Sequence, residues 1–156
     1  MKSLTILVLT LTLCSCAKGQ LDLYNSEGKK VGECTAGYDW HLYGAEYSVD
    51  WLLNWCAQSA IKDGTKVVAV SDPFILEKDY SFPETESGSH WTKKSSWEAF
   101  HLDLITEKEY GYILAYIENE FYLRNLLAQQ KIDQGVIGEA DYQQLLKESK
   151  LLFYGH

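Results

Sequence analysis

Residues 106–131 read TEKEYGYILAYIENEFYLRNLLAQQK, and this stretch decides the fold of the C-terminal half of the chain. Thr106 and Glu109 have the spacing of a capping box, in which two side chains bind each other's backbone N–H groups at a helix start. The residues that follow form one stripe at helical spacing, made of Tyr110, Ile113, Leu114, Ile117 and Phe121 and continued by Arg124 and Leu127. The pattern predicts one long helix that ends near residue 131.

A second helix is predicted to follow, from residue 139 to about residue 153. Gly135 and Gly138 mark the break between the two helices, because glycine commonly follows a helix end. The side chains expected to face the first helix are Tyr142, Leu145, Leu146 and Leu152. A short connection makes two helices antiparallel neighbours, so the sequence predicts a C-terminal antiparallel helical hairpin.

The N-terminal half is predicted to contain β-strands as well as a helix. Residues 21–34 alternate between apolar and polar around the turn sequence Asn-Ser-Glu-Gly at 25–28, which predicts a small β-hairpin. Ser48 is expected to cap a helix over residues 48–62, because a serine hydroxyl can accept a hydrogen bond from a free N–H group at a helix start.

The rest of this half completes the predicted fold class. Residues 66–71 form a β-branched run that is typical of a strand. Residues 72–93 contain both prolines of the chain and are expected to be a long exposed connection. We therefore predict an α+β fold in a single domain, with a β-containing part over 16–93 and a helical part over 94–156.

The first 15 residues have the composition of an export signal. Lys2 supplies a positive charge, and residues 4–13 are an uncharged run of Leu, Ile, Val and Thr. Ten helical residues span about 15 Å, whereas the hydrocarbon core of a bilayer is about 30 Å thick. The run is too short to cross a membrane and fits the apolar region of a signal peptide over residues 1–15.

Residues 13–16 read LCSC and resemble the lipobox of bacterial lipoproteins. The resemblance implies cleavage before Cys16, lipidation of its sulfur and anchoring to a membrane. Because Ala17 rather than aspartate follows, it also implies sorting to the outer membrane in a Gram-negative cell. An ordinary signal peptide cleaved after Gly19 is the other possibility, and it would release a secreted protein. Both possibilities place residues 16–156, or nearly all of them, outside the cytoplasm.

The charge of the chain limits its partners. It has 14 basic and 22 acidic residues and a formal net charge of −8. Affinity for nucleic acid depends on Lys and Arg against phosphate, and docking on anionic lipid also needs basic residues. We therefore expect a solvated acidic surface and no nucleic-acid partner, with membrane contact only through the lipid anchor.

Cys34 and Cys56 are the only cysteines outside the export segment. In an oxidising compartment an isolated pair is most simply a structural disulfide. A reactive thiol and two buried free thiols are the other possibilities, but no C-x-x-C motif is present. The sequence favours the disulfide.

Aromatic residues are concentrated in residues 38–55, at Tyr38, Trp40, Tyr43, Tyr47, Trp51 and Trp55. One interpretation is a stacking platform for a sugar ring or an apolar peptide, with candidate ligand-binding residues Tyr38, Trp40, His41 and Tyr43. The other is core packing, because Trp51 and Trp55 are four residues apart and share one helix face. The sequence favours the core and leaves the platform open.

No motif in the sequence indicates an enzyme. The chain lacks G-x-S-x-G, P-loop and H-E-x-x-H sequences, and its four histidines are scattered, so we expect no metal site and no cofactor. The predicted function is that of a non-enzymatic envelope lipoprotein, which binds another envelope component or itself through the helices over 106–153. A small-ligand or carbohydrate-binding protein that uses residues 38–55 is the alternative.

Overall fold

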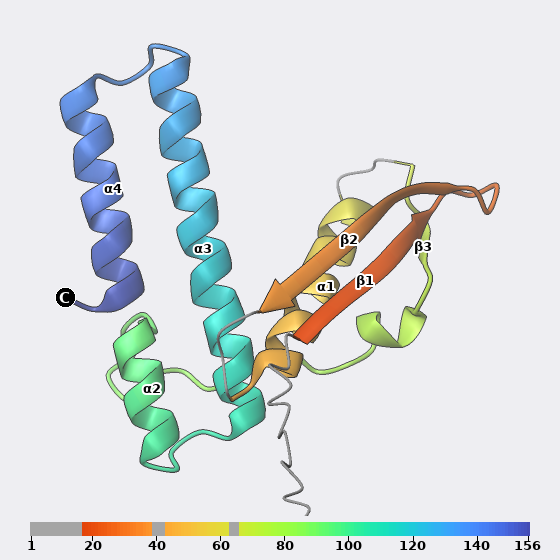
Figure 1. Ribbon diagram of the computed structural model, residues 1–156, viewed down its shortest axis with the longest axis horizontal. Helices are drawn as coiled ribbons and strands as arrows, with labels where there is room; N and C mark the ends of the chain where they lie inside the picture. The colour runs from red at the N-terminus through yellow and green to blue at the C-terminus, as the bar shows by residue number, and fades with distance from the viewer. Residues whose placement is uncertain (1–16, 39–42, 63–65) are drawn as a thin grey trace, which may run out of the picture.

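The computed structural model describes residues 17–38, 43–62 and 66–156 and has an α+β fold, as predicted (Figure 1). Its three strands form one antiparallel sheet with the order β2-β1-β3. Helix α1 covers one face of this sheet, whereas α3 and α4 form a long hairpin that extends away from it (Figure 1). The elements follow in the order β1 (Ala17–Tyr24), β2 (Lys30–Tyr38), α1 (Ala45–Lys62), β3 (Ala69–Val70), the 3-10 helix η1 (Pro73–Leu76), α2 (Lys93–His101), α3 (Glu107–Asp133) and α4 (Glu139–Tyr154).

The predicted β-hairpin is present and is longer than the sequence indicated. Asn25 Oδ1 accepts hydrogen bonds from the N–H groups of Glu27 and Lys29 across the turn, and Gly28 has a φ of +73°, a value that glycine adopts without strain. The strands pair as far as Ala17 and Tyr38. The pairing extends this far because, along both strands, every second residue is small or apolar and faces α1.

Helix α1 begins at Ala45, three residues before the predicted start, so the prediction that Ser48 is the N-cap is wrong. Ser48 is completely buried within the helix, and its hydroxyl donates a 2.7 Å hydrogen bond to the carbonyl oxygen of Gly111 in α3. A serine that bonds across a helix crossing looks the same in the sequence as a capping serine. The first turn instead contains a hydrogen bond from the Ser48 N–H to the carbonyl oxygen of Gly44.

Helices α1 and α3 cross at two glycines. A Cβ atom added to Gly111 would lie 2.4 Å from the carbonyl oxygen of Gly44 and 2.8 Å from the Cβ of Tyr47. The backbones of the two helices are therefore close enough at this point to exclude any side chain. This crossing joins the β-containing part of the fold to the helical part.

The core lies in two clusters, one on each side of this crossing. The first lies between the sheet and α1 and includes Leu21, Cys34 and Leu53. A disulfide between Cys34 and Cys56, as predicted, joins β2 to α1 within this cluster. The second cluster is formed by α2, α3 and α4 and includes Ile113, Leu114, Ile117 and Phe153.

The two C-terminal helices confirm the predicted hairpin. The capping box at the start of α3 is present, with the Glu109 N–H donating to Thr106 Oγ1 and the Thr106 N–H donating to Glu109 Oε2. Phe121 of α3 stacks on Phe153 of α4 with the ring centroids 4.5 Å apart. The far ends of α3 and α4 extend away from the sheet and from α2 (Figure 1).

The segment over residues 72–93 is not the exposed connection that the sequence predicted. Ile75 and Trp91 are buried, and the rings of Tyr80 and Phe82 contact Tyr112 and Tyr116 of α3, with centroids 5.1 and 5.4 Å apart. Prolines and glycines disfavour regular hydrogen bonding, but they do not prevent the aromatic residues between them from packing. The predicted strand over 66–71 is shorter in the structure, where only Ala69 and Val70 form β3.

Candidate functional site

Of the four candidate ligand-binding residues, the structure describes Tyr38 and Tyr43, and these two lie in different surroundings. Tyr38 is buried at the end of β2, and burial together with the nearby Glu118 carboxylate raises the pKa of its phenol well above the usual value. Tyr43 is half-exposed, and its ring lies against Phe100 with the centroids 5.3 Å apart. Trp40 and His41 lie outside the described residues.

The later aromatic residues of this block contribute to the interface between α1 and α3. Tyr47 contacts the ring of Tyr112 edge-on, and Trp51 contacts Tyr116 in the same way, with centroids 6.3 and 6.2 Å apart. Edge-to-face pairs at these distances are stabilising. The described part of the block therefore packs mainly against α3.

An exposed apolar stripe runs along the distal half of α3. We call Tyr122, Leu126 and Leu127 the distal stripe, and their side chains are all exposed, Tyr122 to 63% and Leu127 to 55%. Leu127 lies eleven residues, or about three helical turns, beyond Tyr116. It therefore lies on the side of α3 that packs against α1 nearer the start of the helix. The distal stripe continues this apolar side beyond the reach of α1.

This stripe corrects part of the sequence prediction. Arg124 and Leu127 were expected to continue the inward stripe of the long helix, but both side chains are exposed. Phe121 stacks on α4 and Ala128 is buried. The prediction is wrong because a helix turns by 100° per residue. After Phe121, Ala128 is therefore the residue at the centre of the side of α3 that faces α4, and Arg124 lies only at the edge of that side.

A cluster of polar groups lies where residues 77–92 cross α3 and α4. His90 Nε2 lies 3.3 Å from Glu120 Oε2, and Arg124 Nη2 lies 3.6 Å from the same oxygen. The Tyr116 hydroxyl donates a 2.9 Å hydrogen bond to Glu120 Oε1. Burial and this bond to a carboxylate raise the pKa of Tyr116 to about 12. Glu120 therefore binds three side chains and fixes the segment before α2 onto α3.

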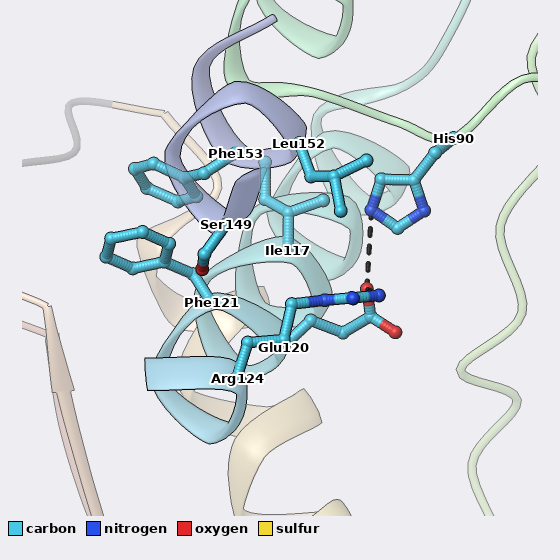
Figure 2. A pocket seen from close by; sticks show the side chains of 8 residues that line it. All are labelled: His90, Ile117, Glu120, Phe121, Arg124, Ser149, Leu152 and Phe153. Carbon is cyan, nitrogen blue, oxygen red and sulfur yellow. Dashed lines mark ion pairs between the residues drawn. The ribbon is translucent and has the colours of Figure 1, made fainter. Parts of the chain in front are cut away.

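This cluster forms one wall of a small cavity (Figure 2). Figure 2 shows the His90 ring facing Glu120, whereas Ser149 lies beside Phe121 and apart from His90. Ser149 Oγ is buried and has no hydrogen-bond partner among the described residues. The cavity has a volume of about 10 Å³, which is about enough for one water molecule. It has no room for a substrate, and its serine and histidine do not form the contact that nucleophilic catalysis needs.

A larger groove lies on the far side of residues 83–91, between this loop and α2. We call it the acid-rimmed groove, and it encloses about 430 Å³. Its apolar part includes Trp91, Leu102 and Leu104, and its remaining lining includes the carboxylates of Glu84, Glu86 and Glu98. No basic residue of the described chain lines it.

No family model, curated protein or solved structure matches this chain. Among the described residues, no helix combines the length and the apolar composition that a bilayer crossing requires. In the same parts of the chain, no three His, Cys, Asp or Glu residues are placed to hold a metal ion.

Sequence reasoning missed both the Glu120 cluster and the acid-rimmed groove. His90, Tyr116 and Glu120 come from two segments with no local motif in common. Leu104 is 60% exposed at the mouth of the groove. The exposed residues Leu102 and Leu104 lie on either side of Asp103, which has a φ of 55°. No pattern of apolar spacing signals such a turn.

Proposed function

We propose that the chain is an exported, lipid-anchored protein of the cell envelope that acts by binding rather than by catalysis, and that it binds through the distal stripe of α3. The observation that carries this proposal is the exposure of Tyr122, Leu126 and Leu127 on a hairpin that extends away from the sheet and from α2 (Figure 1). Isolated exposed apolar residues are common. Apolar side chains that adjoin one another on a single face mark interaction sites.

The partner that we propose is a second copy of the chain. The seam between α3 and α4 is only half-buried along its distal part, where Tyr142, Leu145 and Leu146 remain partly exposed. The distal stripe lies on the outer side of α3, because Leu126 is five residues after the α4-facing Phe121 and is therefore turned from it by about 140° around the helix. A second copy that packs its own stripe against this outer side covers the apolar side chains that neither α1 nor α4 reaches.

Leu126→Glu tests the proposed surface. It places a charge in the stripe, and we expect the dissociation constant of the dimer to rise at least about fivefold, because removing an interface anchor costs about 1 kcal/mol or more. Light scattering over a dilution series measures the constant. Ala140→Glu is the matched control, since it adds the same charge at an exposed position in the first turn of α4. Equal dimerisation of both variants, or a monomeric wild type, rules out the proposed surface.

The start of the fold supports the lipoprotein type of processing over cleavage after Gly19. Strand β1 begins at Ala17, the residue that follows Cys16, and Gly19 pairs with Ala36 inside the sheet. Cleavage after Gly19 would remove the strand residues that pair with Ala36, Gly37 and Tyr38. Cleavage before Cys16 leaves every described strand residue in the mature protein. Cys16 itself lies outside the described residues.

Metabolic labelling with palmitate tests the anchor. In a bacterial host, we expect the wild-type chain to incorporate the label and Cys16→Ser to lose it completely, because the proposed lipid is attached through that sulfur. Cys14→Ser is the control and is expected to keep the label, since it removes the neighbouring thiol and leaves the attachment residue in place. A mature wild-type protein that begins at Gln20 by mass spectrometry contradicts the lipid anchor.

A further inference from the structure

The acid-rimmed groove is a second surface of the molecule, apart from the distal stripe. Its lining comes from the loop over 83–91, from α2, and from the residues between α2 and α3. At about 430 Å³, the groove falls within the roughly 300–1,000 Å³ typical of ligand sites.

The apolar part of the groove is open to solvent at its mouth. Leu102 is 69% exposed and Leu104 is 60% exposed, whereas Trp91 beneath them is buried. The Trp91 indole N–H donates a 2.8 Å hydrogen bond to the carbonyl oxygen of Pro83, so its ring is held in place by the loop that it supports. The apolar floor is therefore rigid, and its rim carries leucine side chains that lack a cover among the described residues.

The charged groups of the groove are of one sign only. Glu84, Glu86 and Glu98 line it, and none of these carboxylates forms an ion pair within the described residues. The hydroxyls that line the groove are already hydrogen-bonded within the protein, those of Thr85 and Ser87 to the Ser89 hydroxyl and that of Ser95 to the Thr92 hydroxyl. The polar groups left for a ligand are thus carboxylates, which bind ammonium or guanidinium groups.

We propose that the acid-rimmed groove binds a segment of a partner protein in which a lysine or arginine adjoins a leucine-like side chain. The apolar side chain lies on Leu102, Leu104 and the edge of Trp91, while the cationic group reaches the three carboxylates. Charge complementarity selects this occupant, because an acidic or neutral segment would leave the carboxylates without a partner. The alkyl stem of lysine or arginine also covers apolar surface while its charged end remains at the rim.

The test uses the purified protein and the capped peptide with the sequence Leu-Lys-Leu-Lys, at two salt concentrations. Nuclear magnetic resonance should show saturable shifts at the Trp91 indole N–H and at the amides of α2. Replacing Glu84, Glu86 and Glu98 together by glutamine should weaken binding at least tenfold and reduce its dependence on salt. The matched control replaces Glu27, Glu46 and Glu77 by glutamine, which changes the net charge equally outside the groove, and it should bind within twofold of wild type.

Two further peptides separate the parts of the proposal. The Ser-Lys-Ser-Lys peptide keeps both charges and lacks the apolar groups, and it should bind at least tenfold more weakly. A Leu-Glu-Leu-Glu peptide should not bind. The proposal is overturned if the control variant loses as much affinity as the groove variant, because the attraction is then general to an acidic protein. It is also overturned if the serine peptide binds equally well, if a simple alkylamine binds where the peptide does not, or if no peptide shifts the Trp91 signal.

Discussion

Gly111→Ala is expected to lower the free energy of unfolding by about 2 kcal/mol. The added methyl group would meet the carbonyl oxygen of Gly44 at 2.4 Å and the Cβ of Tyr47 at 2.8 Å. The nearer of these atoms belongs to the backbone, so relief requires α1 and α3 to move apart. Such overpacking costs roughly 1–3 kcal/mol. The same movement would also strain the hydrogen bond from the Ser48 hydroxyl to the Gly111 carbonyl oxygen. Alanine regains about 1 kcal/mol through its higher helix propensity.

Urea unfolding followed by tryptophan fluorescence measures this loss. Gly138→Ala is the matched control, because the same change meets no atom within 4 Å there and the φ of −86° suits any residue. We expect the control to lose only about 0.5–1 kcal/mol, because alanine is a poorer N-cap than glycine but meets no steric clash at this position. Equal stability of the two variants would show that the helices do not cross at these glycines.

Removing the disulfide is expected to cost about 3 kcal/mol. Cys34 and Cys56 are bonded and are separated by 22 residues in sequence, and the chain-entropy model gives a value of this size for a loop of that length. The bond also holds β2 against α1, where the Cys34 side chain is almost completely buried. A variant with both cysteines replaced by alanine should therefore unfold at a clearly lower urea concentration.

The reductant dithiothreitol provides the internal control for this prediction. In the reductant, the wild-type protein should lose most of the stability that it has over the double alanine variant. The variant itself should unfold at the same urea concentration with and without the reductant. If the wild-type midpoint is unchanged by full reduction, the disulfide does not stabilise the fold.

Much of the architecture was predictable because its signals are local. The capping box of Thr106 and Glu109, the turn over 25–28 and the break between α3 and α4 each involve residues a few positions apart. Hydrogen bonds over such distances depend little on the rest of the chain. The pairing of Cys34 with Cys56 was predictable for another reason, since the other two cysteines lie within residues 1–16, which the sequence predicts to be an export signal.

The remaining features depend on contacts between distant segments. Ser48 bonds to Gly111, 63 residues away, and nothing near Ser48 in the sequence indicates that contact. The ring contacts of Tyr80 and Phe82 depend on where α3 lies. The acid-rimmed groove exists only because the loop over 83–91 lies beside α2. Apolar spacing indicates which face of one element is buried, but it does not indicate which other element covers it.

The central claim is that the distal stripe of α3 binds a second copy of the chain. Hydrogen exchange measured by mass spectrometry at low and high protein concentration tests it most directly, because amide protection reports local opening. The account predicts that exchange around Tyr122, Leu126 and Leu127 slows as the concentration rises, while exchange in β1 and β2 stays constant. Exchange that is independent of concentration throughout α3, or protection that increases only in the sheet, would contradict the account.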